Sequence, residues 1–115
     1  MSEFQLFRKK PVIIRAARWL TNGDHPEDYA EDASPYYRRE KEGAVVRFYR
    51  HHVPGERLCQ HCRVQMHSHG WIDTKEGGHI VCPGDWIITG VAGERYPCKP
   101  DIFDATYELV PESAA

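Results

Sequence analysis

The feature that most constrains this chain is a group of metal-binding residue types between residues 59 and 82. In chain order these are Cys59, Cys62, His67, His69 and Cys82. A Cys-x-x-Cys pair in a tight turn can present both thiolates to one ion, and Zn²⁺ prefers four thiolate or imidazole ligands in a tetrahedron. The stretch therefore predicts a bound zinc ion.

The other ligands depend on how a hairpin after residue 69 is paired. Residues 70–74 and 79–82 are typical of two short strands, and the glycine-containing residues 75–78 join them. If these four residues form the loop, Trp71 lies opposite Cys82. This register decides which side chains share a face of the hairpin.

In that register His69 and Cys82 project from the same face as diagonal neighbours, at a separation of ~6 Å that a metal ion can bridge. A slip of one residue would place them on opposite faces. The predicted ligands are therefore Cys59, Cys62, His69 and Cys82, with His67 in place of Cys82 as the alternative. Four protein ligands leave no position for water, so the predicted zinc is structural and no catalytic residue is assigned.

Length and composition indicate a single soluble domain. A chain of 115 residues, with 41% hydrophobic and 28% charged residues, is typical of one globular domain, here residues 1–115. Within it, residues 53–82 form the zinc-knuckle and hairpin segment and residues 21–43 a loop-rich excursion. No apolar run is long enough for a membrane span and no signal peptide is evident, so we expect a cytoplasmic protein. Reduced thiols in that compartment favour metal binding over disulfides.

The periodicity predicts an α+β, β-rich fold: a small antiparallel sheet or partly open barrel of five to seven strands, with one or two short helices. Strands are expected at residues 11–19, 44–50, 70–74, 79–82, 86–89, 94–98 and 107–110. Helical turns are expected at residues 26–32 and, after a proline suited to a first turn, at residues 100–105. The expected core consists of Trp19, Trp71, Trp86, Tyr96 and Phe103.

Charge is nearly balanced overall but uneven along the chain. A formal net charge of −2 gives no bulk attraction to nucleic acid. Residues 23–33 are acidic and residues 47–63 basic, and such runs are usually solvated faces. A pocket lined by the tryptophans and by Arg47, Arg50 and Arg95 would suit an anionic nucleotide.

Two segments of the amino-acid sequence are distinctive. Residues 8–16 read RKKPVIIRA, and residues 70–110 read GWIDTKEGGHIVCPGDWIITGVAGERYPCKPDIFDATYELV. Over about half the chain this resembles a group of small bacteriophage and prophage proteins of uncharacterised function, whose C-terminal half reads PGDWII-G-V-GE-YPCKPDIF-TYE. The resemblance implies a phage-derived protein acting in the cytoplasm of a bacterial host, and it brings no catalytic residues.

The same resemblance bears on the cysteines. Many members of the group lack the Cys-x-x-Cys pair and a cysteine at the position of Cys82, whereas they keep the one corresponding to Cys98. This assigns Cys82 to the metal knuckle and Cys98 to the shared scaffold. A nucleophilic role for Cys98 would need a base placed in space, and a buried structural thiol is the preferred interpretation.

Together these patterns favour a non-enzymatic, zinc-stabilised binding protein that engages a host protein or a small anionic ligand, including one that counteracts host defence. The alternatives are a metal-dependent hydrolase or nuclease and a nucleic-acid-binding zinc module. No dinucleotide-binding, phosphate-loop or HExxH motif is present in the sequence. Partners, ligand residues and oligomeric state are not specified by the pattern.

Overall fold

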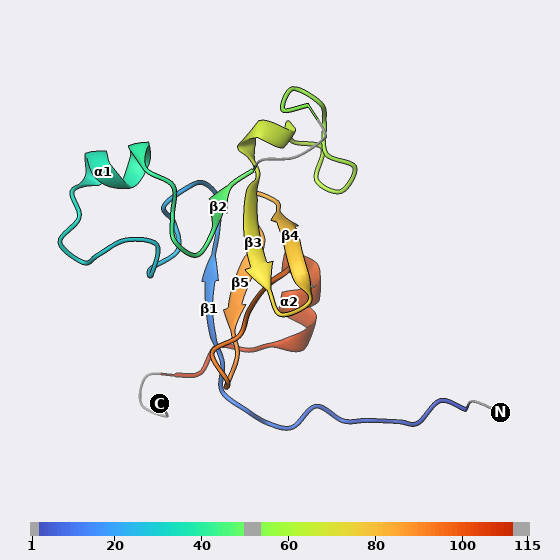
Figure 1. The fold of residues 1–115 in the computed structure, drawn as a ribbon. Coiled ribbons are helices and arrows are strands. Elements are labelled where there is room, and N and C mark those ends of the chain that lie inside the picture. The colour runs from blue at the N-terminus through green and yellow to red at the C-terminus, as the bar shows by residue number, and fades with distance from the viewer. Residues whose placement is uncertain (1–2, 50–53, 112–115) are drawn as a thin grey trace.

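The computed structural model describes residues 3–49 and 54–111, which form two small antiparallel sheets. One sheet has the order β1-β5-β6, with strands Arg15–Arg18, Trp86–Thr89 and Arg95–Cys98. The other has the order β2-β3-β4, with strands Arg47–Phe48, Gly70–Thr74 and Gly77–Val81. The sheets do not close into a barrel (Figure 1), so the predicted small antiparallel β-rich fold is confirmed in its open form.

Three short helices accompany the sheets in the described part of the chain. They are α1 at Pro35–Glu40, the 3₁₀ helix η1 at Met66–Ser68 and α2 at Pro100–Thr106. The position of α2 agrees with the helix expected after the proline. None of these helices combines the length and the hydropathy that a bilayer-crossing segment needs.

The main core lies between the two sheets and is more aliphatic than expected. It consists of Trp19, Val45, Val46, Ile72, Val81 and Ile87. Of the five aromatic residues expected there, only Trp19 is buried. Trp86 instead stacks on Phe103 of α2, with ring centroids 4.2 Å apart, at the side of the molecule.

Two element predictions are wrong for local reasons. The helix of the excursion forms at Pro35–Glu40 and not at residues 26–32, because Ser34 caps it by accepting a hydrogen bond from the Tyr37 amide at 3.1 Å. Residues 107–110 form no strand. Tyr107 packs against Phe103 instead, with ring centroids 5.1 Å apart.

The β3–β4 hairpin is tighter than expected. Its loop is Lys75-Glu76, so Thr74 pairs with Gly77, and Trp71 lies opposite Ile80 instead of Cys82. Gly77 adopts a φ of +109°, a conformation that favours glycine. The predicted register is therefore wrong by two residues. A two-residue shift preserves the face of every side chain, and the last pair, Gly70 with Val81, leaves the two predicted metal ligands beside each other just beyond the strand ends.

Candidate metal centre

The knuckle at Cys59 and Cys62 is a compact backbone turn. The Cys59 amide donates to the Val64 carbonyl at 2.8 Å, and the Arg63 amide donates to the Cys59 carbonyl at 3.0 Å. Arg63 has a φ of +67°, the left-handed conformation that reverses the chain. This closed turn directs both cysteine side chains towards the end of the β3–β4 hairpin.

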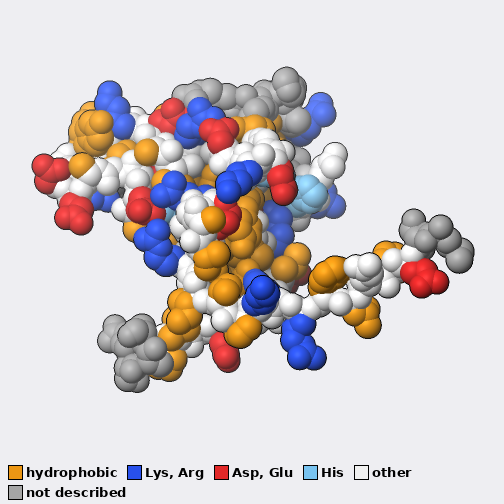
Figure 2. Space-filling model, turned by 60° about the horizontal axis from the view of Figure 1, so that its bottom comes forward, with side chains coloured by type: hydrophobic (Ala, Val, Ile, Leu, Met, Phe, Trp, Pro, Cys, Tyr) orange, Lys and Arg blue, Asp and Glu red, His pale blue; other side chains and the backbone are white. Residues whose placement is uncertain are grey.

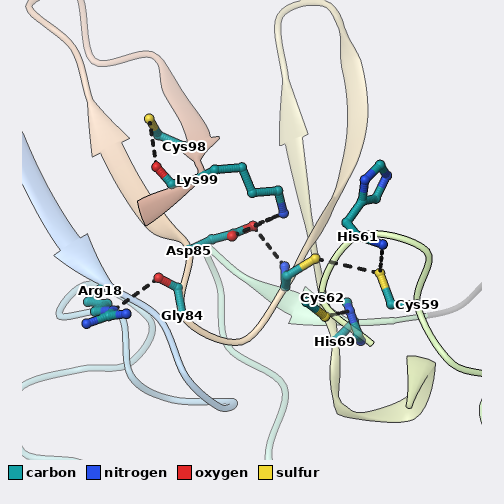
Figure 3. Close-up of polar contacts among 10 residues, drawn as sticks. Arg18, Cys59, His61, Cys62, His69, Gly84, Asp85, Cys98 and Lys99 are labelled. Carbon is teal, nitrogen blue, oxygen red and sulfur yellow. Dashed lines mark hydrogen bonds and ion pairs between the residues drawn. The ribbon is translucent and has the colours of Figure 1, made fainter. Parts of the chain in front are cut away.

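The structure brings the four predicted ligands together. The side-chain donor atoms of Cys59, Cys62, His69 and Cys82 all lie within 4.8 Å of one another. Cys59 Sγ lies 3.9 Å from Cys82 Sγ, and Cys62 Sγ lies 3.2 Å from His69 Nε2, a pair that Figure 3 labels. A tetrahedral zinc ion places its sulfur ligands about 3.8 Å apart and a sulfur and a nitrogen about 3.5 Å apart. These two distances are close to those values, and the four donors are near enough to one another to hold one metal ion.

The imidazole of His69 is oriented for metal binding. Its Nδ1 lies 3.0 Å from the Gln65 carbonyl oxygen, so Nδ1–H donates there and the lone pair of Nε2 faces the thiols. Burial lowers the pKa of His69 and keeps the ring neutral. A neutral ring with a free Nε2 is the state in which histidine binds a metal.

Two of the thiols differ in how readily they ionise. Burial alone raises the pKa of Cys59, but the backbone N–H groups of Cys62 and His61 outweigh it, so the net pKa is lowered. The His61 amide donates to Cys59 Sγ at 3.3 Å. Burial raises the pKa of Cys82 to about 12. A metal cation would supply the positive charge that makes a buried thiolate at this position favourable.

A buried carboxylate, paired with a half-buried lysine, supports Cys82 from the other sheet. Asp85 is 2% exposed, and its carboxylate accepts from the Cys82 amide at 2.9 Å and from Lys99 Nζ at 3.0 Å. Burial by itself lowers the pKa of Lys99, but hydrogen bonds with Cys82 and Asp85 raise it above its ordinary value. The ammonium group thus stays charged next to the Cys82 sulfur.

Sequence reasoning missed this pair. The Pro83-Gly84-Asp85 turn directly after Cys82 predicts that Asp85 accepts backbone N–H groups, as an aspartate in a turn commonly does, but it does not predict the lysine partner. Lys99 gives no such signal, since only the pairing of β5 with β6 brings it close.

The remaining candidate residues lie elsewhere. His67 is exposed and does not join the cluster, and Cys98 is partly exposed, with its thiol directed at the Lys99 carbonyl oxygen at 3.7 Å. Arg47 pairs with Asp73 at 2.6 Å. Its guanidinium is therefore engaged by a carboxylate, and the expected pocket of tryptophans and arginines stays a prediction.

The other two arginines expected at that pocket are Arg95 and Arg50. Arg95 pairs with Glu27 at 3.1 Å. Arg50 lies outside the described residues.

A different pocket adjoins the cluster. It has a volume of about 490 Å³ and lies between the β3–β4 hairpin and β6. Trp71, His61, His79, Cys82 and Lys99 are among the residues that line it. The indole of Trp71 covers Gly78 in the hairpin, so one wall of the pocket is a flat aromatic surface beside basic groups.

Fold and site together define a small antiparallel β domain with a Cys₃His cluster that could hold a metal ion. No protein-family model matches the chain, and neither a curated protein nor a solved structure matches it. The resemblance to the bacteriophage group stays a prediction from the sequence.

Proposed function

We propose that this is a phage-type, non-enzymatic binding protein whose fold is stabilised by one structural zinc ion at Cys59, Cys62, His69 and Cys82. The observation that carries the proposal is the convergence of these four donors, with His69 Nε2 freed for the metal by the bond from Nδ1 to Gln65. Four protein ligands complete a tetrahedron. The set therefore favours a structural ion over a metal-dependent hydrolase, which needs an open position for water.

The ligand we propose is a small anionic molecule with a planar ring, bound in the pocket beside the cluster. The Trp71 indole offers a stacking surface, and Lys99 with His61 and His79 supplies positive or hydrogen-bonding groups. In a bacterial host such a ligand would be a soluble nucleotide of the kind used in defence signalling. The alternative partner is a host protein that binds over the same pocket.

The metal proposal is tested by zinc analysis of purified protein. We expect one zinc per chain, and loss of both zinc and thermal stability in Cys59→Ser and Cys82→Ser or after treatment with a strong chelator. Zinc binding supplies folding energy, so its loss should lower the melting temperature by at least about 10 °C. Cys98→Ser is the matched control, because this thiol lies outside the cluster. Stoichiometric zinc in both ligand variants would contradict the proposal.

Ligand binding is tested by titrating the zinc-loaded protein with nucleoside monophosphates, while tryptophan fluorescence is recorded. We expect quenching by the nucleotides and none by inorganic phosphate alone, because stacking on Trp71 is required. His79→Ala should weaken the binding about fivefold or more, whereas the exposed His67→Ala should not. Equal weakening by both variants would contradict this pocket. Salt-sensitive binding of DNA in place of nucleotides would favour the nucleic-acid module instead.

A further inference from the structure

Residues 3–14 run as an extended arm outside both sheets and lead into β1 (Figure 1). Leu6 and Phe7 of this arm are 97% and 88% exposed, and Phe4 is fully exposed. Figure 2 shows the arm projecting from the body with hydrophobic and basic side chains along it. Three large apolar side chains exposed within four residues form a contiguous apolar surface of the kind that marks an interaction site.

An apolar groove lies at the base of the arm. It has a volume of about 550 Å³, and Ile13, Trp86, Phe103, Tyr107 and Leu109 are among the residues that line it. Leu109 is 94% exposed and Ile13 66%. The volume is in the range of clefts that enclose a ligand, so the groove can accept more than one large side chain.

The arm of the same chain is directed away from this groove. Residues 12–14 already form one of its walls, and the Lys9 ammonium lies over the Tyr107 ring, 3.7 Å from its centroid, and bonds the Tyr107 hydroxyl. Lys9 therefore fixes the arm at the rim of the groove. Phe4 and Leu6 lie beyond that point and extend into solvent.

We propose that residues 3–8 of each copy occupy the groove of a second copy, in a two-fold symmetric, arm-exchanged dimer. Arg8 at the base of this segment is basic, and Asp104 and Glu108 at the groove are acidic, so the charges at that end of the contact are complementary. Phe4 and Phe7 then become buried against Trp86 of β5 and Phe103 of α2 in the other copy.

The buried area is sufficient for a stable dimer. A phenylalanine buries about 150–250 Å², so the four phenylalanines of two arms bury roughly 600–1,000 Å². The groove surfaces that they cover add a comparable area. The total exceeds the approximately 1,000 Å² that a specific interface needs.

Sedimentation velocity of the full-length, zinc-loaded chain tests the dimer. We expect a dimer at micromolar concentration and a monomer for Phe4→Ser combined with Phe7→Ser, with a dissociation constant raised about a hundredfold or more. These residues lie outside the sheets, so the monomeric variant should keep the circular-dichroism spectrum of the folded chain. Val91→Ser is the matched control, because Val91 is an exposed apolar residue in the β5–β6 turn. A monomeric parent chain, or a dimer that survives in the arm variant, would overturn the proposal.

Photocrosslinking then identifies the occupant of the groove. Phe4 is replaced by p-benzoylphenylalanine, and equal amounts of ¹⁴N- and ¹⁵N-labelled chains are mixed before irradiation. We expect mixed-isotope crosslinks between residue 4 and a peptide that contains residues 103–110. Crosslinks within one chain would show that the arm folds onto its own groove, and crosslinks between two arms would show a different interface. Either result, or no crosslink, overturns the arrangement.

Discussion

At the scale of single residues, the acidic run in the excursion contains a structural carboxylate. Asp28 is buried, and its Oδ1 accepts from the amides of Val45 and Val46 at 2.8 and 3.1 Å. Gly43 lies so close that a Cβ there would come within 2.5 Å of the Asp28 carboxyl carbon. The expectation that the whole run is a solvated face is therefore wrong at this position.

Asp28→Ala should destabilise the protein by about 2–4 kcal/mol, because two buried N–H groups beside the core lose a charged acceptor. Urea unfolding followed by circular dichroism measures the loss. Asp32→Ala, an exposed neighbour in the same run, should change the free energy of unfolding by less than about 0.5 kcal/mol. Equal effects of the two substitutions would show that the carboxylate acts only through the net charge of the run.

At the scale of elements, the β3–β4 hairpin carries both the metal ligands at one end and an aromatic wall along its length. The Trp71 indole lies directly on Gly78 of the neighbouring strand, where an added Cβ would come within 1.9 Å of a ring carbon. The two glycines of the hairpin are required for different reasons. Gly78 leaves room for the indole, whereas Gly77 has open space around it and adopts a positive φ. The sequence indicated a glycine turn but not that one glycine makes room for a ring.

Gly78→Ala should displace the Trp71 indole and cost about 2 kcal/mol, because the new methyl group overlaps the ring. ¹⁹F NMR of protein labelled with fluorotryptophan should show one resonance shifted, that of Trp71. Gly77→Ala is the control: it should cost about 1 kcal/mol through backbone strain and leave the three resonances in place. An unmoved Trp71 resonance in Gly78→Ala would contradict the packing.

At the scale of the whole molecule, the Cys₃His cluster connects parts of the chain that share little other structure. Cys59 and Cys62 come from a loop, whereas Cys82 follows β4 of one sheet and is held by Asp85 and Lys99, which flank β5 and β6 of the other. The predicted effect of removing the proposed zinc ion extends over the whole molecule. Loss of the ion should loosen the knuckle, the hairpin end and the contact between the sheets in one transition.

The sequence by itself determined the features that depend on neighbours along the chain. The Cys-x-x-Cys spacing, the strand-like alternation and the glycine turn were enough to place His69 and Cys82 on one face, even with a register two residues off, because side-chain direction in a strand has a period of two. The short helix after Lys99 followed from its proline.

Only the tertiary structure decided which distant residues meet. The bond from Asp28 to Val45, the ion pair of Lys99 with Asp85 and the pocket beside the cluster join segments far apart in the chain, and no local pattern encodes their distance. The basic residues Arg47 and Arg95 looked free in the sequence but are paired with carboxylates in the fold. The first pair depends on the register of β2 against β3, and the second on how the loop-rich excursion packs beside β6, and neither can be read from the local sequence.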